Sequence, residues 1–231
     1  MLNRDGDWTR FRFRGGLDPD MPLIRKGAEA NLYLEDWHDY KVIVKRRVCK
    51  TYRLRALDTK LRSFRTIHES QIMHEAKRSG VPTPIIYLVD PKEYTIVMEF
   101  VSGRRLKEAI EETSNEGRRD ICQLAGCQIA MLHHNNIIHG DLTTSNMILT
   151  DEQKIFFIDF GLSYYSIEVE DRGVDLHLMK RALNSTHYLH GEKCFGHVIQ
   201  GYKELAGTKR THEVVEKVRE IERRGRYYAE R

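Results

Sequence analysis

Several features that mark other classes of protein are missing from this sequence of 231 residues. Its four cysteines form no C-x-x-C pair and show no disulfide-framework spacing, so we expect reduced thiols in a cytosolic compartment. No apolar run, including the one around residues 155–158, is long enough to cross a bilayer. The first ten residues, MLNRDGDWTR, lack the apolar core of a signal peptide, and no internal repeat stands out. We therefore expect a protein that has no membrane span and is not exported.

The composition is that of an ordinary folded protein, with 40% apolar and 31% charged residues. The net charge is only +4, but the basic residues are unevenly distributed. Between residues 41 and 65 a single acid, Asp58, accompanies ten bases: Lys41, Lys45, Arg46, Arg47, Lys50, Arg53, Arg55, Lys60, Arg62 and Arg65. Two interpretations stay open for this basic stretch, a solvated face or a surface that binds phosphates or nucleic acid.

The first part of the chain is predicted to be rich in strands. Residues 22–37 indicate two short strands around a glycine-containing turn. Residues 40–48 indicate a third strand, with Val42 and Val44 on one face and Ile43 and Lys45 on the other. A helix is expected from about residue 57 to residue 79, where Gly80, Pro82 and Pro84 stop it, and a strand is expected over residues 94–103.

The second part of the chain is predicted to be rich in helices. Apolar residues recur at helical spacing from Ile121 to Leu132, and again in Val214, Val218 and Ile221 before a helix end at Gly225. Between these helices, residues 146–159 indicate a β-hairpin. A strand-rich part followed by a helix-rich part, joined near residues 98–103, suggests two lobes with a cleft between them.

The residue types needed for phosphoryl transfer occur in a workable order. Such a site requires a lysine that binds the nucleotide phosphates, an acid that pairs with that lysine, oxygen ligands for Mg²⁺ and a base near the acceptor. Lys45 ends an apolar strand, and Glu69 in the next helix is its expected partner, with Glu75 as a competitor. Asp141 and Asn146 are five residues apart, and Asp159 follows Asn146 by 13 residues, the interval at which a hairpin returns one loop beside the other. This spacing is more specific than any of the single motifs.

These motifs resemble those of a known superfamily. VIVK, HGDLTTSN and DFG together are similar to the protein-kinase-like superfamily. With KGAEANLY, VIVKRRVCKTYR, RTIHES, GVPTP, EDRGVDL and RRGRY added, the chain resembles one small family, the atypical kinase subunit of the KEOPS/EKC complex, also called the PRPK family. The similarity runs from about residue 24 to residue 227.

The resemblance implies an α+β fold with a small two-lobed, protein-kinase-like architecture. It divides the chain into an N-lobe over residues 1–99, a C-lobe over 100–221 and a basic tail over 222–231. It implies catalytic roles for Lys45 and Asp141, Mg²⁺ ligands in Asn146 and Asp159, and a bracing role for Asp175. The implied ATP contacts are Gly27, Ala28, Glu29, Lys45, Glu69, Met98, Glu99 and Phe100, the last three as the adenine-contacting hinge.

Three departures from ordinary protein kinases are visible in the sequence. Gly140 replaces the arginine before the catalytic aspartate, so a phosphorylated activation loop has no local clamp. Thr143 stands where a lysine usually follows that aspartate. Only 16 positions separate Asp159 from Asp175, and no A-P-E sequence occurs, so a conventional peptide-docking platform is not expected.

The resemblance implies that the chain is an ATPase and atypical Ser/Thr kinase. It would use ATP with Mg²⁺ to support threonylcarbamoyladenosine (t6A) modification of tRNA. The implied partners are the tRNA threonylcarbamoyltransferase subunit, other KEOPS subunits and tRNA. Membrane binding is not expected. The tRNA contacts would include the tail residues Arg223, Arg224, Arg226 and Tyr227. The compartment would be the cytoplasm, or also the nucleus if the source is eukaryotic.

Other functions stay open on the residues themselves. Small-molecule phosphotransferases of the aminoglycoside or choline kinase type also use H-G-D-L…N, but they usually carry a histidine after it and a longer acceptor domain. A nucleotide-binding scaffold without turnover is a further alternative. His187, His190, Cys194 and His197 could hold zinc, although their spacing matches no common site. The hydroxyls of Ser163, Tyr164, Tyr165 and Ser166 are candidate phosphoacceptors.

Overall fold

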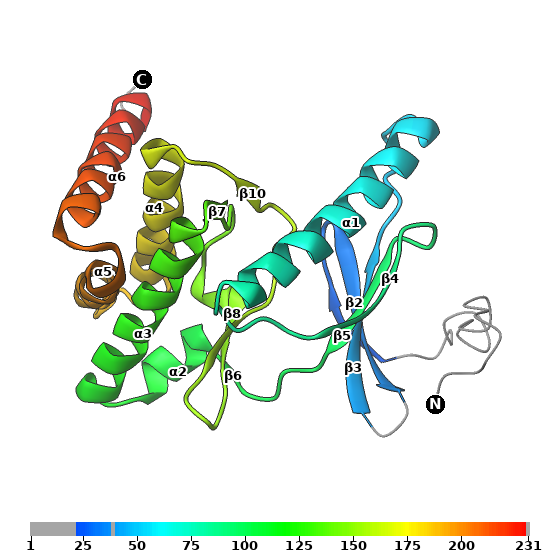
Figure 1. Cartoon of the computed structure of the whole chain (residues 1–231), viewed down its shortest axis with the longest axis horizontal. Helices are drawn as coiled ribbons and strands as arrows, with labels where there is room; N and C mark the ends of the chain where they lie inside the picture. Colours follow the sequence, from blue (N-terminus) through cyan, green and yellow to red (C-terminus); the bar gives the residue numbers. More distant parts are fainter. Residues whose placement is uncertain (1–21, 38–39, 230–231) are drawn as a thin grey trace.

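The first lobe of the molecule is built on an antiparallel sheet of five strands (Figure 1). The computed structural model describes residues 22–37 and 40–229, with backbone alone for residues 225–229. The sheet order is β1-β2-β3-β5-β4. Its strands are β1 (Leu23–Lys26), β2 (Ala30–Trp37), β3 (Tyr40–Arg47), β4 (Ile86–Asp90) and β5 (Thr95–Glu99).

The two faces of this sheet are packed differently, as the alternation in β3 predicts. Val42 and Val44 are fully buried on one face with Val97, beneath the rings of Trp37 and Tyr87, whose centroids lie 5.3 Å apart. Helix α1 covers the other face, to which Lys45 belongs. The predicted division of β3 into an apolar face and a Lys45 face is therefore confirmed.

Helix α1 (Arg55–Arg78) connects the sheet to the second lobe. It ends where predicted, because Gly80 adopts φ +92°, a conformation that favours glycine, and Val81 and Pro82 lead the chain away. The buried side chains of Ile72 and Met73 belong to one hydrophobic cluster that continues through β5 into the helices of the second lobe. This shared core joins the two lobes.

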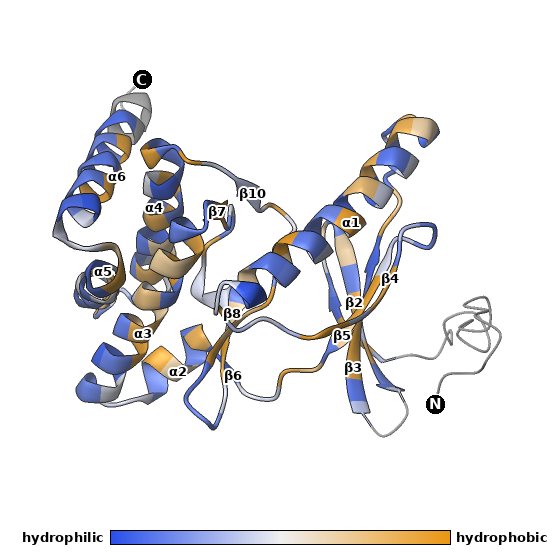
Figure 2. Cartoon of the chain, viewed as in Figure 1, coloured by the Kyte–Doolittle hydropathy of each residue, from blue (hydrophilic) through white to orange (hydrophobic). Residues whose placement is uncertain are grey.

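The second lobe contains five α-helices within the described part of the chain. They are α2 (Leu106–Glu112), α3 (Asn115–His134), α4 (Val169–Thr186), α5 (Gly191–Ala206) and α6 (Thr208–Ala229). Hydrophilic and apolar residues alternate along α1 and α6, as one-sided burial requires (Figure 2).

The second lobe also contains short strands, whose connecting loops face the first lobe. One sheet of three strands has the order β6-β8-β9 and consists of β6 (Arg104–Arg105), β8 (Met147–Leu149) and β9 (Ile155–Phe157). The hairpin predicted over residues 146–159 is confirmed, because Met147 pairs with Phe157. A second pair joins β7 (Ile137–Ile138) to β10 (Tyr164–Tyr165), and a 3-10 turn, η2 (Thr144–Asn146), precedes β8.

Two predicted element ends are wrong. The strand expected to reach Gly103 ends at Glu99, because the chain then leaves the sheet and crosses to the second lobe. The last helix does not end at Gly225 but continues to Ala229, since one glycine costs a helix only about 1 kcal/mol. The tail boundary expected at residue 222 thus falls within α6, and the division at residue 99 stays a prediction.

No helix in the described ranges is both long and apolar enough to cross a lipid bilayer.

Candidate active site

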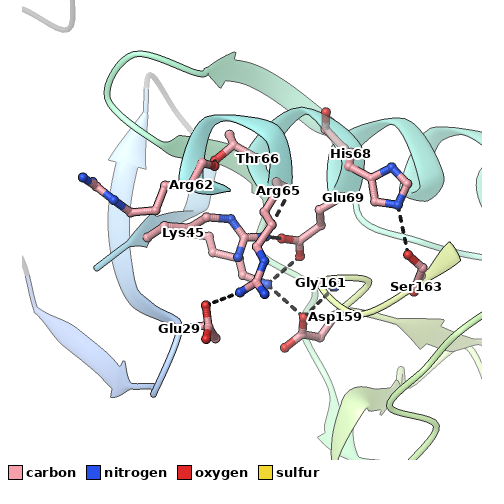
Figure 3. Close-up of polar contacts among 12 residues, drawn as sticks. Glu29, Lys45, Arg62, Arg65, Thr66, His68, Glu69, Asp159, Gly161 and Ser163 are labelled. Atoms are coloured by element: carbon pink, nitrogen blue, oxygen red, sulfur yellow. Dashed lines mark hydrogen bonds and ion pairs between the residues drawn. The ribbon is translucent and has the colours of Figure 1, made fainter. Parts of the chain in front are cut away.

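Three charged side chains from distant parts of the sequence meet at the junction of the lobes (Figure 3). Lys45, on β3, donates from Nζ to Glu69 Oε1 at 2.5 Å and to Asp159 Oδ1 at 2.9 Å. Glu69, on α1, is the expected partner of Lys45, whereas Glu75 pairs instead with Arg78 at the surface. Lys45 therefore links the sheet, α1 and the segment after β9 at one point.

A second cation approaches the same glutamate. Arg47 donates from Nη2 to Glu69 Oε2 at 2.5 Å and to the Arg65 carbonyl at 3.2 Å, so each oxygen of Glu69 holds one cation. Lys45, Arg47 and Glu69 are all buried. Sequence reasoning missed Arg47, although strand alternation gives its signal: two residues after Lys45, it lies on the same face of β3.

These ion pairs border a pocket of about 270 Å³. Arg65 closes one side by donating to Glu29 Oε2 at 2.6 Å, and Arg65 lies one helical turn before Glu69 on α1. The pocket is lined by Arg25, Gly27, Ala28, Glu29, Ala30, Leu32, Lys45, Arg47, Arg65, Asp141, Asn146, Asp159, Gly161 and Leu162. The loop between β1 and β2 thus forms one wall and the predicted catalytic residues form the other.

The charges at this site hold each other ionised. Burial opposes the charged form of Lys45, but Glu69 and Asp159 outweigh it and raise the pKa of the ammonium group. Burial likewise opposes the charge on Asp159, but the charge and hydrogen bond of Lys45 lower the pKa of that carboxyl. The pocket therefore contains a lysine cation beside a carboxylate anion, the combination needed to handle phosphate and a divalent cation.

Asp141 and Asn146 lie at the two ends of one loop. The Asn146 Nδ2 donates to the Asp141 carbonyl at 3.0 Å and to Asp141 Oδ2 at 2.8 Å, which leaves the amide oxygen for a cation. Across the hairpin, Ile158 donates from its N–H to the Asn146 carbonyl at 3.0 Å. The spacing argument is therefore confirmed, because the hairpin brings Asp159 beside Asn146.

Asp175, on α4, braces this loop from below. Its two oxygens accept the backbone N–H of His139 at 2.6 Å and that of Gly140 at 2.9 Å. Its Oδ2 also lies 3.3 Å from His133 Nε2. Burial opposes the charge on Asp175, but the hydrogen bond and charge of His133 lower the pKa of that carboxyl. The bracing position expected for Asp175 is present.

Gly140 is required by the shape of the loop. Its φ is +77°, and an added Cβ would collide with the carbonyl of Leu162. A residue with a side chain, such as the arginine of ordinary kinases, does not fit here without a backbone shift. The replacement seen in the sequence therefore reflects close contact between the catalytic loop and the segment that follows Asp159.

The other predicted residues fall into distinct environments. Met98, Glu99 and Phe100 lie at the end of β5 but do not line the 270 Å³ pocket. Ser163 is buried and donates to the His139 carbonyl at 2.7 Å, so it is not an accessible phosphoacceptor in this structure. Tyr164 and Tyr165 are exposed.

The zinc alternative finds no support in the arrangement of these side chains. Within the described ranges, no group of three or more His, Cys, Asp or Glu is placed to hold a metal ion. His187 instead contacts Glu111, and Cys194 is buried beside Cys122.

Six of the ten bases in the stretch over residues 41–65 are paired with carboxylates, most of which come from elsewhere in the chain. Asp58 is buried beneath two of its arginines, and Glu29, Glu69, Glu93 and Asp159 contact others. The paired bases are Lys45, Arg46, Arg47, Arg53, Arg62 and Arg65. The paired bases support the site and α1, and both interpretations stay open for the unpaired bases of the stretch.

In the C-terminal segment, Arg223 is exposed and Arg224 pairs with Glu170 of α4. The side chains of Arg226 and Tyr227 lie outside the described residues.

Comparisons with known proteins agree with this geometry. Residues 38–197 match the protein kinase domain family. The KEOPS complex subunit Bud32 of Pyrococcus abyssi is 50% identical over 213 residues, which cover 90% of this chain and 96% of that protein. The chain belongs to the Bud32 family. Within that family, the EKC/KEOPS complex subunit bud32 of Dictyostelium discoideum is 39% identical over 88% of this chain and 82% of its own length.

A Bud32-like sequence also occurs within longer proteins. The probable bifunctional tRNA threonylcarbamoyladenosine biosynthesis protein of Methanothermobacter thermautotrophicus is 42% identical over 223 residues. The match covers 96% of this chain but only 40% of that protein. Membership of the Bud32 family confirms the α+β, two-lobed kinase-like fold, and the kinase domain implies ATP binding.

Proposed function

We propose that this chain is an ATP-hydrolysing, atypical Ser/Thr kinase subunit that supports t6A modification of tRNA within a KEOPS complex. The observation that carries the proposal is Lys45, bonded to both Glu69 and Asp159 at the edge of a pocket that also contains Asp141 and Asn146. The tRNA role is supported by its similarity to KEOPS complex subunits and to probable bifunctional tRNA threonylcarbamoyladenosine biosynthesis proteins. Its free cysteines support a reducing compartment such as the cytoplasm.

The residues of the pocket fit ATP with Mg²⁺. Lys45 would bind the nucleotide phosphates, and the loop containing Gly27 would cover them with backbone N–H groups. Asn146 and Asp159 would hold Mg²⁺, which would neutralise phosphate charge when bound. Asp141 would orient the acceptor, water or a hydroxyl, and take up its proton. Met98, Glu99 and Phe100 would contact the base.

Thr143 stands where ordinary protein kinases have a lysine, and arginines of the first lobe would supply the missing positive charge. Arg25, Arg47 and Arg65 line the same pocket as Asp141, and Arg65 is only half-buried. Its partner Glu29 is 45% exposed, so the guanidinium can exchange this carboxylate for a phosphate at small cost. The positive charge would thus come from the N-lobe rather than from the catalytic loop.

An exposed apolar surface beside the cleft supports binding of another subunit. Phe64 and Ile67 are exposed on α1, and His68 bridges to the segment after Asp159 by its contact of 3.0 Å with the Ser163 carbonyl. That segment exposes Leu162 and Tyr165. Neighbouring apolar side chains of this kind mark protein interfaces. The segment is also short, because α4 begins at Val169, and this supports a protein partner over a general peptide substrate.

The test is ATP turnover with and without the transferase subunit and tRNA. We expect strong stimulation by the partner and tRNA. Asp159→Ala should abolish turnover, and Asp141→Ala should reduce it about a hundredfold or more, since such contacts supply about 3 kcal/mol to the transition state. The matched control is Asp151→Ala, in the exposed turn between β8 and β9. Unchanged turnover in folded Asp159→Ala protein would exclude the proposed metal role, and failure of every form to turn over ATP would favour a scaffold.

The end of α6 is proposed to contact tRNA through Arg223, Arg224, Arg226 and Tyr227. Truncation from Arg223 should weaken tRNA binding and flatten its dependence on salt. Because Arg224 also pairs with Glu170, the control is Glu170→Gln, which breaks that pair and keeps the four residues. Equal tRNA affinity of the full and truncated chains would remove this segment from the interface.

A further inference from the structure

A second polar pocket lies in the helical lobe, away from the residues of the proposed ATP site. Its volume is about 200 Å³, and it forms where α3 and α5 end and where α4 and α6 begin. The charged side chains in its wall are Arg172 and Arg210, accompanied by His133 and His134. No aspartate or glutamate is among its described lining residues, in contrast to the ATP pocket with Glu29, Asp141 and Asp159.

Arg172 has unused donors in this pocket. Its Nη2 donates to Asn136 Oδ1 at 3.2 Å, while its Nε is buried and has no partner among the described residues. Buried donors are nearly always hydrogen-bonded, so an unpaired one calls for a missing acceptor. Arg172 forms no ion pair within the described part of the chain, and two acids of the same helix have other partners. Glu170 pairs with Lys217 and Arg224, and Asp175 contacts His133.

Arg210 brings a second positive charge to the same space. It is exposed in the first turn of α6, and within the described ranges it too has no carboxylate partner. The N–H groups of that first turn add the positive end of the helix dipole. Because the turn contains no acidic residue, no carboxylate of its own offsets this charge. Arg172, Arg210 and Tyr202 line the same pocket of about 200 Å³, so both guanidinium groups border one small space.

The inner wall of the pocket is connected to the catalytic loop. Tyr202 lies with its hydroxyl 3.0 Å from His133 Nδ1, and His133 Nε2 lies 3.3 Å from Asp175. Asp175 in turn holds the N–H groups of His139 and Gly140. His133 and Asp175 therefore lie between this pocket and the loop that contains Asp141.

We propose that this pocket binds a phosphate group through Arg172, Arg210 and the N-terminus of α6. Two guanidinium groups without a carboxylate, beside a helix N-terminus, are suited to a tetrahedral oxyanion. The phosphate could be free inorganic phosphate or a phosphodiester of RNA, and both sources share this chemistry. The proposal does not depend on ATP turnover at the other site.

The experiment compares single variants of the full chain in two binding assays. Inorganic phosphate is titrated at constant ionic strength against wild type, Arg172→Gln and Arg210→Gln by calorimetry. Arg219→Gln is the matched control on α6, since Arg219 is exposed and pairs with Glu216 outside the pocket. Arg65→Gln reports phosphate bound in the ATP pocket instead. Thermal unfolding of each variant establishes that it is folded, and Arg210→Gln decides the test if the partly buried Arg172 is needed for folding.

The second assay measures tRNA affinity across a range of salt concentrations with the same variants. We expect at least a tenfold loss of phosphate affinity in Arg210→Gln and no loss in Arg219→Gln. If tRNA affinity is unchanged, free phosphate is the ligand. If tRNA affinity falls and the slope of log K against log salt decreases by about one, an RNA phosphodiester is the ligand. The proposal is overturned if Arg210→Gln changes neither phosphate nor tRNA binding, or if the phosphate signal is lost only in Arg65→Gln.

Discussion

Replacement of Asp175 by asparagine tests how the catalytic loop is held. The Asp175 side chain is fully buried, and its two oxygens accept the N–H groups of His139 and Gly140. Asparagine keeps the shape of the side chain but exchanges one oxygen for an NH₂ group. Whichever way the amide turns, one backbone N–H then faces another donor, so one hydrogen bond is lost and one buried N–H is left without an acceptor.

The expected loss follows from the contacts at this residue. A hydrogen bond to a charged group contributes about 1.5–3 kcal/mol, and an unsatisfied buried donor costs about 1–3 kcal/mol. We therefore expect Asp175→Asn to lower the free energy of unfolding by about 2.5–6 kcal/mol. This is a large part of the roughly 5–15 kcal/mol that stabilises a typical domain. Folded variant protein should also turn over ATP slowly, because Asp141 follows directly after the two released residues.

Urea denaturation and amide hydrogen exchange together measure this effect. The control is Asp151→Asn, an exposed acid in the turn between β8 and β9, whose change should stay within about 0.5 kcal/mol. Exchange at His139 and Gly140 should accelerate in Asp175→Asn beyond the change that global destabilisation explains. A loss below about 1 kcal/mol, with protection at both amides retained, would refute the assignment of Asp175 as the brace.

The acid dependence of stability provides an independent check with a definite sign. The pKa of Asp175 is lowered in the folded state from its ordinary value of 3.8, so its contribution is present above that value. The contribution is lost as the pH falls below 3.8 and through the folded-state pKa. The difference in unfolding free energy between wild type and Asp175→Asn should therefore be constant near neutrality and shrink in this acidic range. A difference that grows on acidification would contradict the argument.

Three further substitutions probe other parts of the site. Glu69→Gln leaves two buried cations without their shared carboxylate and should cost about 3–5 kcal/mol in urea denaturation, whereas Glu75→Gln, at the surface of the same helix, should cost little. Gly140→Ala forces a Cβ against the Leu162 carbonyl at positive φ and should lower the melting temperature and ATP turnover together; an unchanged melting temperature would show that the loop relaxes freely. Arg65→Gln should raise the KM for ATP about tenfold with little change in stability, as expected for loss of one charge-assisted contact to phosphate, and an unchanged KM would exclude it from phosphate binding.

Local patterns in the sequence were sufficient for the parts of the fold that depend on neighbouring residues. The alternation in β3 placed Lys45 opposite the valine face, and the interval between Asn146 and Asp159 predicted the hairpin that joins them. The same reasoning failed for the strand expected to reach Gly103, because tertiary packing decides where the chain leaves the sheet and crosses to the second lobe. It also failed at Gly225, since a single glycine weakens a helix without ending it.

Charge pairing over long distances could not be predicted from composition. The basic stretch over residues 41–65 contains one acid, yet four of its arginines meet carboxylates supplied by residues 29, 69 and 93. A linear count therefore overestimates the charge available to a ligand. The reverse holds for the second pocket, where Arg172 and Arg210 are 38 residues apart in sequence and form no visible cluster. Only the packing of four helix ends brings them together.

The exchange of arginine for Gly140 gains a structural explanation from these contacts. In ordinary protein kinases the arginine before the catalytic aspartate can clamp a phosphorylated activation segment, which orders the site. Here the segment after Asp159 is short, pairs with β7 through Tyr164 and Tyr165, and packs so closely on Gly140 that no side chain fits. The backbone N–H of Gly140 is held instead by Asp175 from within the lobe. Order in the catalytic loop therefore does not require phosphorylation of that segment, and control of turnover is expected to come from a bound partner. Replacement of both tyrosines by phenylalanine should accordingly leave partner-stimulated ATP turnover unchanged, and its loss would show that phosphorylation of the segment contributes after all.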